Sequence, residues 1–340
     1  MPSYLITGAS RGLGFEFLRQ LSADPTNLVI GLVRNKAATE EKVAHELKRD
    51  NIRIVQGELT DYDSLKNAVE AVEKITPSLD HLIANAAVVS TWSAWDGLGT
   101  LAAKDPAGLT ADLLSSLNTN LIGNINLITL FLPLIQRSAI KKVIAITTGM
   151  ADLDFIAHYN IAIGAPYSIS KAALNAAIAK FSAEYRKDGI LFLGLSPGLV
   201  DTSEGKAEMT EEQKAGVASM VAQFATYAPA WKGPITPEES VGLLRGVIER
   251  AHVDRGYAGA FLNERLPIAY NNQLDPSPIT YRTSIQTLTN PAPKARGSAA
   301  RDLPAPDCPP TAPQAQEPPS AGHPAACGST QRCPSTPHTE

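Results

Sequence analysis

The 340-residue chain is 44% hydrophobic and has a formal net charge of −4, which is sufficient for one large domain or two small ones. The mild acidity and the lack of a basic run argue against nucleic-acid binding. No signal peptide is expected before the first apolar strand, and the longest apolar run, around residues 127–135, is too short to span a bilayer and contains Pro133. We therefore expect a cytoplasmic protein that does not bind membranes.

A metal centre or a disulfide framework is not expected in the body of the chain. All three cysteines, Cys308, Cys327 and Cys333, lie near the C-terminus, and the histidines before residue 260 are scattered without the spacing of metal ligands. We therefore predict that the protein has no metal site.

Short apolar runs alternate with helical patterns from the start of the chain to about residue 263. The predicted strands are 4–7, 28–33, 53–57, 81–84, 141–147, 191–196 and 257–262. The predicted helices include 14–22, 62–75, 111–136 and 167–186. Nearly continuous hydrophobic strands that alternate with helices indicate an α/β fold with a parallel sheet covered on both faces.

The composition divides the chain into three parts. Residues 1–265 are predicted to form a single domain, with later helices that start at capping boxes in 210–213 and 236–239. Residues 266–290 form an extension of uncertain structure. Residues 291–340 are predicted to be a disordered tail, because proline is abundant there and apolar periodicity is absent.

A glycine-rich segment follows the first strand and opens the first helix. Glycines at these positions allow a tight turn and bring the backbone close to a pyrophosphate, which binds at the helix N-terminus. The segment therefore predicts a dinucleotide-binding loop of the Rossmann, doubly wound type. Its candidate cofactor-binding residues are Gly8, Ser10, Arg11, Gly12, Leu13 and Gly14.

A tyrosine and a lysine are spaced four residues apart in Tyr167-Ser-Ile-Ser-Lys171. On a helix both side chains would lie on one face. A nearby cation favours the phenolate and so lowers the pKa of a phenol, which makes it a better proton donor to a carbonyl. Together with the dinucleotide loop, this pair predicts hydride transfer.

The Gly-x-x-x-Gly-x-Gly spacing and the Tyr-x-x-x-Lys motif resemble those of the short-chain dehydrogenase/reductase family, over about residues 1–263. Carbonyl reductases and C-signal-like members are the most similar branches. The resemblance implies that Tyr167 donates the proton, that Lys171 lowers its pKa and binds the nicotinamide ribose, and that Asn120 holds a water in the proton relay. Asn118 is close in sequence, but only Asn120 has a glycine three residues later.

Further cofactor contacts follow from the same resemblance. Glu58 and Leu59 match an aspartate and an apolar residue beside the adenine, with glutamate in place of aspartate. Asn85 and Ala86 match the turn after the fourth strand. The segment that contacts the nicotinamide carboxamide is matched by Pro197, Gly198, Val200 and Thr202.

The chain departs from the family at the catalytic serine. Thr147 and Thr148 end the fifth predicted strand, where the family usually has a Ser-Ser pair. Thr148 retains a hydroxyl and is our candidate third catalytic residue, although its methyl group takes space beside the substrate. Thr147 is the alternative. The interval to Tyr167 is longer than usual in the family, so residues 152–166 could form a wall of the pocket.

The choice between NADPH and NADH depends on the end of the second strand. An NAD-specific site usually has an acidic residue there, whereas this chain has Arg34, and Arg11 lies in the glycine loop. Two guanidinium groups could bind a 2′-phosphate, with no carboxylate to repel it. We therefore predict NADPH/NADP+ as the cofactor.

The substrate side is predicted to be apolar. A region between Thr202 and Ile235 corresponds to the family's substrate lid, and Trp92 and Trp95 could line the same cleft. Such side chains suit a hydrophobic or aromatic ketone. The apolar residues of the lid region are Met209, Met220, Val221, Phe224, Tyr227 and Trp231.

The sequence thus predicts an NADPH-dependent enzyme that reduces a ketone or aldehyde to an alcohol. One alternative is a non-catalytic protein that senses the cofactor or binds partners through the same fold; Thr148 and Glu58 are the residues that favour it. Epimerase or dehydratase chemistry is disfavoured by the glycine spacing. Whether the protein is a monomer or a homo-oligomer is left undecided.

Overall fold

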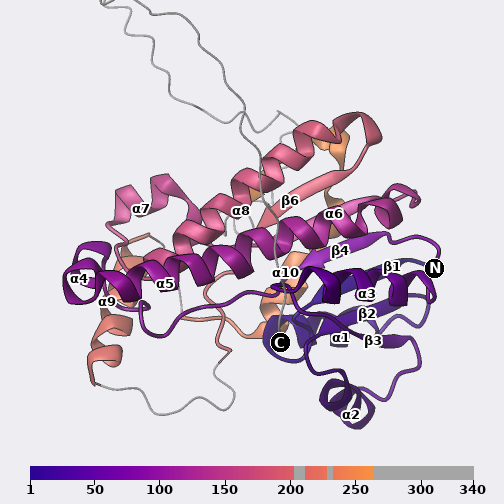
Figure 1. Ribbon diagram of the computed structural model, residues 1–340, viewed down its shortest axis with the longest axis horizontal. Helices are drawn as coiled ribbons and strands as arrows, with labels where there is room; N and C mark the ends of the chain where they lie inside the picture. The colour runs from indigo at the N-terminus through magenta and orange to yellow at the C-terminus, as the bar shows by residue number, and fades with distance from the viewer. Residues whose placement is uncertain (203–210, 228–232, 263–340) are drawn as a thin grey trace, which may run out of the picture. The chain divides into compact units, whose positions relative to one another are not determined.

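A parallel seven-stranded sheet forms the centre of the protein (Figure 1). The structure is a computed structural model that describes residues 1–202, 211–227 and 233–262. The strand order is β3-β2-β1-β4-β5-β6-β7, so the chain winds outward in both directions from β1 and β4. The strands are β1 (Ser3–Thr7), β2 (Leu28–Val33), β3 (Ile52–Gln56), β4 (His81–Ala84), β5 (Lys142–Ile146), β6 (Leu191–Leu195) and β7 (Phe261–Leu262). The predicted Rossmann fold is confirmed.

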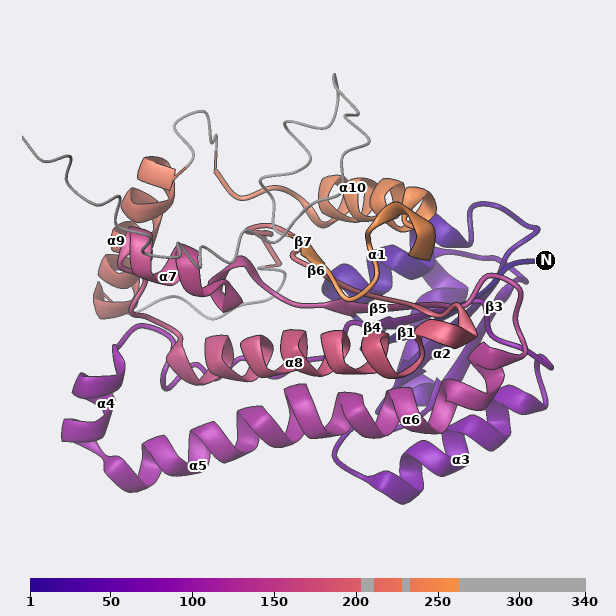
Figure 2. The ribbon, with the colours of Figure 1, turned by 90° about the horizontal axis from the view of Figure 1, so that it is seen from above.

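Helices cover both faces of this sheet (Figure 2). On one face α1, α2 and α10 pack on the strands, and on the other α3, α6 and α8 do so; each face has its own buried apolar cluster. The α-helices are α1 (Gly12–Leu21), α2 (Lys36–Glu46), α3 (Tyr62–Glu73), α4 (Leu98–Lys104), α5 (Pro106–Leu117), α6 (Gly123–Gln136), α7 (Leu153–Tyr159), α8 (Ala165–Glu184), α9 (Glu211–Tyr227) and α10 (Pro237–Arg250).

Most predicted elements are present, with two clear differences. The helix predicted over 111–136 begins earlier, at Pro106, where Asp105 caps it, and a π-helical turn over Asn118–Ile122 separates α5 from α6. The last strand was predicted over 257–262 but is only two residues long, because Gly256 and Gly259 adopt positive φ angles and turn the chain before it.

The capping prediction for α10 is confirmed. The Thr236 hydroxyl accepts a hydrogen bond from the Glu239 amide, and the Glu239 carboxylate accepts one from the Thr236 amide. The other predicted capping box begins at Thr210, outside the described residues. The predicted extension and tail, residues 266–340, also lie outside them.

The second half of the apolar run over Pro106–Gln136, helix α6, belongs to the core. The length of the run and its mean hydropathy of 1.2 are those of a helix able to cross a membrane, but half of its most apolar window is buried in the protein. α5 packs against α8, and α6 packs against α3. Among the described residues this is the one helical run of that kind; burial accounts for the apolar residues of α6, whereas Ser116 is the buried residue of α5.

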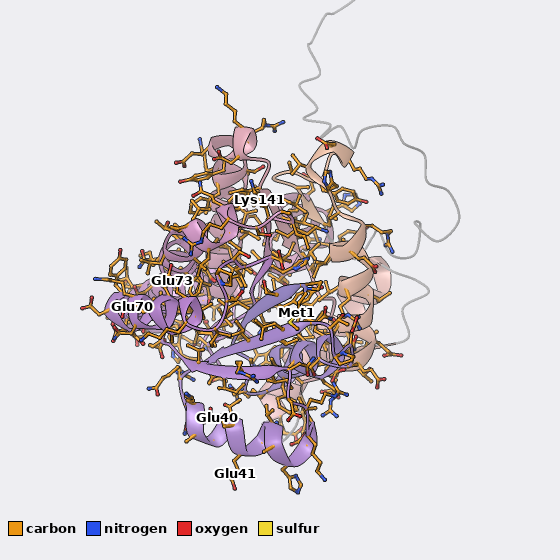
Figure 3. All side chains as sticks on the ribbon, turned by 90° about the vertical axis from the view of Figure 1, so that its right-hand side faces the viewer. Met1, Glu40, Glu41, Glu70, Glu73 and Lys141 are labelled. Carbon is orange, nitrogen blue, oxygen red and sulfur yellow. The ribbon has the colours of Figure 1, made fainter. Side chains whose placement is uncertain are left out.

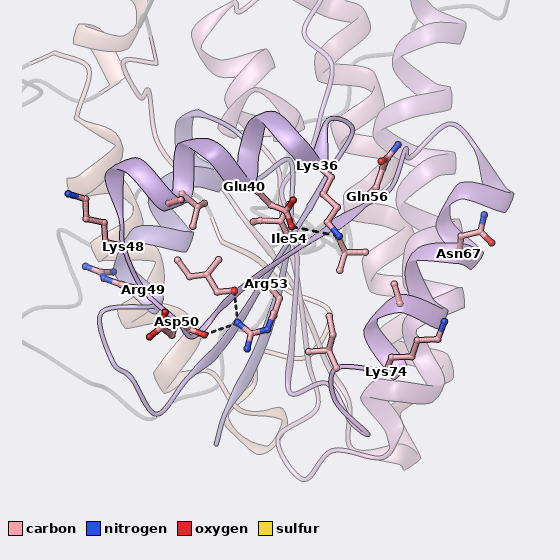
Figure 4. A pocket seen from close by; sticks show the side chains of 16 residues that line it. Lys36, Glu40, Lys48, Arg49, Asp50, Arg53, Ile54, Gln56, Asn67 and Lys74 are labelled. Carbon is pink, nitrogen blue, oxygen red and sulfur yellow. Dashed lines mark hydrogen bonds and ion pairs between the residues drawn. The ribbon is translucent and has the colours of Figure 1, made fainter.

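The open edge of the sheet at β3 is protected by charge. A hollow of about 930 Å³ lies along β3 between α2 and α3 (Figure 4). Arg53 folds across it and donates from Nη1 to the Asp50 and Ile52 carbonyl oxygens, at 2.7 and 2.8 Å. Charged side chains on an edge strand oppose pairing with another chain. We therefore interpret the hollow as part of a protected sheet edge and not as a ligand site. Elsewhere on these helices Glu41 and Glu70 point to solvent (Figure 3).

His81 is a buried histidine at the opposite end of the sheet from the glycine loop. Its ring stacks on Tyr4 with the centroids 4.2 Å apart, and it pairs in the sheet with Lys142. Burial, followed by the charge of Lys142, lowers the pKa of His81 to about 4. The folded protein therefore holds this imidazole neutral, whereas the unfolded chain protonates it at its ordinary pKa.

We expect His81 to weaken the fold in acid. The folded pKa of His81 lies below its unfolded pKa of about 6.5. Above pH 6.5 the imidazole is neutral in both states and costs the fold nothing. As the pH falls from 6.5 toward 4, the unfolded chain gains a proton that the folded protein does not, and the free energy of unfolding decreases. The cost reaches about 3 kcal/mol at pH 4. His81→Phe keeps the stacking and removes the proton, so urea unfolding between pH 7.5 and 4.5 should show a smaller loss in the variant. Equal losses in both proteins would contradict this.

Candidate functional site

The predicted cofactor residues gather at the carboxyl ends of the central strands. The connections that follow β1 and β4 run to opposite faces of the sheet, so a topological switch point lies between these two strands. Ligands bind at such points in open α/β sheets. The glycine loop follows β1, and Asn85 follows β4. The fold therefore brings these two segments together, although they are far apart in the sequence.

The glycine loop is a tight backbone turn. Gly8 and Gly12 have φ angles of +69° and +54°, a region that side chains disfavour. A Cβ on Gly14 would lie 2.2 Å from the Gly8 carbonyl oxygen, so only glycine fits there. Ser10 and Arg11 are exposed on this loop, and Leu13 is half-buried.

The start of α1 is suited to bind an anion. Its N-cap residue, Arg11, makes no side-chain capping bond, and the first turn contains no acidic residue. By contrast, Asn35 and Asp61 cap α2 and α3 with their own side chains. The first amide groups of α1 are therefore left for a phosphate, as the glycine loop requires.

The turn after β4 is bonded directly to β1. The Thr7 hydroxyl accepts hydrogen bonds from the Asn85 and Ala86 amides, at 3.0 and 2.9 Å, and Asn85 Nδ2 donates to the Thr7 carbonyl oxygen at 2.9 Å. Ala86 lies so close to Gly8 that a Cβ there would be 3.0 Å from the Ala86 Cα. Asn85 and Ala86 thus form one wall of the cradle.

The segment after β6 lies over the glycine loop. Gly198 has a φ of +87°, and Val200 forms an isolated bridge with Ile235. The Pro197 carbonyl oxygen accepts a hydrogen bond from Ser240 at 2.6 Å. Thr202 comes close to Gly12: a Cβ on that glycine would meet its Cγ2 at 3.7 Å. Of the predicted residues of this segment, Thr202 is the one shown to lie beside the glycine loop.

The surroundings of Arg34 differ from the sequence prediction. Glu58, which follows β3, places its Oε2 3.7 Å from Arg34 Nε. The expectation that no carboxylate lies near the predicted 2′-phosphate site was therefore wrong, because β2 and β3 are neighbours in the sheet. Leu59 is buried beside Gly123, where a Cβ would lie 2.7 Å from the Leu59 carbonyl oxygen.

The predicted reacting groups meet at the start of α8. The Tyr167 side chain is hydrogen-bonded to the Thr148 hydroxyl. Lys171 Nζ lies 6.0 Å from the centre of the Tyr167 ring and donates to the Ile146 carbonyl oxygen at 2.7 Å. Three side chains, from the end of β5 and one turn of α8, thus lie together, with Thr148 and Tyr167 half-buried and Lys171 buried.

Burial dominates the ionisation of this site. It raises the pKa of Tyr167 to about 12, against the opposing effect of the Thr148 hydrogen bond, and it lowers the pKa of Lys171 to about 7. The pKa of Tyr167 is thus raised in this structure, where the sequence prediction had Lys171 lowering it, and desolvation of the phenolate is the main cause. Tyr167 is therefore a neutral phenol at pH 7.

The two threonines at the end of β5 have different surroundings. Thr148 caps the short 3₁₀ turn over Gly149–Ala151 and accepts a hydrogen bond from the Met150 amide at 3.2 Å while contacting Tyr167. Thr147 is buried, and its hydroxyl has no hydrogen-bond partner among the described residues. Only Thr148 is positioned beside the tyrosine.

Asn120 is fully buried in the π-helical turn, where its side chain joins two other segments by hydrogen bonds. Its Oδ1 accepts from the Val88 amide at 2.8 Å, and its Nδ2 donates to the Val88 carbonyl oxygen and to Ser170 Oγ, at 3.0 and 2.9 Å. Both hydrogens of the amide are therefore engaged with protein. A water held by Asn120 would donate to the second lone pair of Oδ1 or to the backbone carbonyl oxygen, which also accepts from Asn124 Nδ2.

Comparison with known proteins assigns the family. The family model described as short chain dehydrogenase matches residues 3–214. The chain belongs to the short-chain dehydrogenase/reductase family. Short chain dehydrogenase virK of Hypocrea virens is 51% identical over 265 residues, which cover 77% of this chain and 97% of that protein. Short-chain dehydrogenase/reductase iacC of Pestalotiopsis fici is 45% identical over 269 residues, covering 78% and 97%.

A solved structure supports the same assignment. NADPH-bound carbonyl reductase from chicken fatty liver aligns with a TM-score of 0.60 and 26% identity, over 77% of this chain and 96% of that one. The short-chain dehydrogenase/reductase fold described above is therefore shared over nearly the whole length of this relative.

The substrate side of this short-chain dehydrogenase/reductase is partly described. A Cβ on Gly216 of α9 would lie 2.9 Å from Trp95 Cε3, so the helix rests closely on that indole; Trp92 packs near Gly108. Met220 and Val221 are half-buried on α9. Met209 and Trp231 lie outside the described residues, and the side chains of Phe224 and Tyr227 are not described. α7, within the long 152–166 interval, packs against α9.

Sequence reasoning missed three contributors to the site. Ser170 links Asn120 to the Tyr167 carbonyl oxygen, to which its hydroxyl donates at 2.7 Å. Asn124 supports the π-helical turn, and the Arg34–Glu58 contact joins two strands. Ser170 lies within the Tyr-x-x-x-Lys motif and Asn124 one turn after Asn120, but nothing in the sequence identifies their partners.

We expect Lys171 to weaken the fold that contains it. Its folded pKa of about 7 lies below its ordinary value of 10.5. Burial of this amine therefore lowers the free energy of unfolding. The whole cost is present below pH 7, and it decreases as the pH rises toward 10.5. Lys171→Met should raise the melting temperature by about 2–4 °C or more at pH 6. The gain should shrink at pH 9. Thermal unfolding at both pH values measures this.

Lys180→Met is the matched control, since Lys180 lies exposed on the same helix. This variant should leave the melting temperature almost unchanged at either pH. A stabilisation of equal size in both variants would show that helix α8 merely prefers methionine, and a loss of stability in Lys171→Met would contradict the expected desolvation cost.

Proposed function

We propose that this protein is an NADPH-dependent carbonyl reductase that converts an apolar or aromatic ketone or aldehyde to an alcohol. The observation that carries the proposal is the contact between the half-buried Tyr167 and Thr148 side chains, with the buried Lys171 one turn away. A neutral phenol and a hydroxyl at one point can both donate to a single carbonyl oxygen. The relative solved with NADPH is a carbonyl reductase, which supports the same chemistry.

The cradle fits a nicotinamide dinucleotide. The uncapped start of α1 and the positive φ angles of Gly8 and Gly12 leave amide groups and space for a pyrophosphate. Arg11 and Arg34 would bind the 2′-phosphate of NADPH, and Thr202 would contact the nicotinamide carboxamide. When bound, the cofactor supplies the hydride.

The protein residues handle the proton and the developing negative charge. Tyr167, a neutral phenol at pH 7, gives its proton to the substrate oxygen as that oxygen gains charge. Thr148 donates a hydrogen bond to the same oxygen, in the role usually filled by serine. Lys171, in its ammonium form, would stabilise the resulting phenolate. A protonated resting phenol suits carbonyl reduction better than alcohol oxidation.

The substrate preference and the cellular location are also part of the proposal. The half-buried Trp95 beside α9, together with Met220 and Val221, supports an apolar substrate. We propose a cytoplasmic location for this short-chain dehydrogenase/reductase fold. A non-catalytic, cofactor-sensing role is the competing proposal, which the following experiment separates.

Tyr167→Phe should abolish reduction and preserve cofactor binding. Loss of a general acid lowers the rate by about 10²–10⁴-fold, whereas the ring still fills its buried place. NADPH consumption with a panel of apolar aryl ketones gives the rate, and the thermal shift with NADPH gives binding. A cofactor-sensing protein would show no turnover in the wild type, and its Tyr167→Phe variant would lose nothing.

Thr148→Val and Thr147→Val form a matched pair, because both remove one hydroxyl and keep the side-chain shape. Thr148→Val should lower the reduction rate by about 10²–10³-fold, as expected for loss of an oxyanion donor. Thr147→Val should leave it within about twofold, since that hydroxyl has no partner among the described residues. Steady-state kinetics decide, and the opposite ranking would give the catalytic role to Thr147.

A further inference from the structure

Glu58 brings a fixed negative charge to the place where the cofactor's 2′-phosphate would bind. Arg34 follows β2 and Glu58 follows β3, and the neighbouring strands bring Glu58 Oε2 to 3.7 Å from Arg34 Nε. The Arg34 side chain is 79% exposed, and its contact with Glu58 is made through Nε. The guanidinium is therefore available to an anion but already has one counter-ion.

The carboxylate is held in place by the start of α3. Its Oε1 accepts hydrogen bonds from the Thr60 amide and hydroxyl, at 3.3 and 3.2 Å, and the Glu58 amide donates to Ser64 Oγ at 3.1 Å. These bonds restrain the backbone of Glu58 and one of its carboxylate oxygens beside Arg34.

This charge acts in opposite directions on the two nicotinamide cofactors. A 2′-phosphate is attracted by Arg11 and Arg34 but repelled by Glu58, and it must share the Arg34 guanidinium with that carboxylate. A free ribose hydroxyl is not repelled, and a carboxylate can accept its hydrogen bond. Glu58 therefore narrows the difference in affinity between NADPH and NADH.

We infer that Glu58 is a cofactor-selectivity residue whose carboxylate, reaching Arg34 from the neighbouring strand, limits the preference for NADPH over NADH. The inference rests on the proposed binding of NADPH. The side-chain length matters: glutamate places its carboxylate one methylene farther out than aspartate would, so the contact with Arg34 depends on glutamate.

The test measures binding without turnover. Dissociation constants of NADPH, NADH, 2′,5′-ADP and 5′-ADP are determined by calorimetry for the wild type, Glu58→Gln and Glu58→Asp. Glu58→Gln keeps the length and the oxygen that Thr60 contacts but removes the charge. It should tighten NADPH and 2′,5′-ADP by about two- to fivefold, the range for an exposed ion pair, and leave NADH and 5′-ADP unchanged or weaker.

Two further arms sharpen the test. The shorter Glu58→Asp should give part of the same gain, because its carboxylate withdraws from Arg34. The gain should shrink as salt rises from 50 to 500 mM, because exposed charges are screened. Glu73→Gln is the control: Glu73 forms a comparable exposed pair with Arg137, at 3.0 Å, on the end of α3 away from the glycine loop. It should change no constant.

The outcomes separate this inference from the proposed function. Suppose that the wild type binds NADPH and that Glu58→Gln leaves the ratio of the affinities for NADPH and NADH unchanged or lowers it. Glu58 then does not weaken the binding of the 2′-phosphate, and the inference fails while the proposed cofactor stands. If folded wild-type protein binds neither dinucleotide, both the proposed function and the inference fail.

Discussion

The hydrogen bonds between the ends of β1 and β4 are the interaction on which the rest of the site depends. Thr7 accepts from two successive amides of the turn after β4, and Asn85 returns a bond to the Thr7 carbonyl oxygen. A Cβ on Gly14 would lie 2.8 Å from Asn85 Nδ2. The glycine pattern is thus a packing requirement of this junction as well as a cradle for a cofactor.

The same junction is linked to the reacting groups through buried polar contacts. Asn120 binds both backbone groups of Val88, beyond the β4 turn, and also Ser170, whose hydroxyl bonds to the Tyr167 backbone. A change in the turn after β4 would therefore reach α8 through two side chains. The π-helical turn over Asn118–Ile122 is the local irregularity that contains Asn120, consistent with the frequent occurrence of such turns at functional sites.

Burial shifts pKa values both inside and outside the site. Tyr167 and Lys171 are shifted where a proton and a charge can be used, whereas His81 is shifted to about 4 among packed side chains at the other end of the sheet. A perturbed pKa therefore identifies a functional residue only where neighbouring side chains can act with it in a reaction, as the hydroxyl groups of Thr148 and Tyr167 can. The large apolar clusters on both faces of the sheet offset the cost of these groups.

The sequence by itself determined the parallel sheet, its strand positions to within a few residues for six strands, and the family to which the chain belongs, because apolar runs and the spacing of glycine, tyrosine and lysine are local patterns. Only the tertiary structure decided between Thr147 and Thr148 as the hydroxyl beside Tyr167, raised rather than lowered the pKa of that tyrosine, and brought Glu58 to Arg34. These outcomes depend on which strands are neighbours and on how completely side chains are buried, and neither property is encoded in any short segment of the chain.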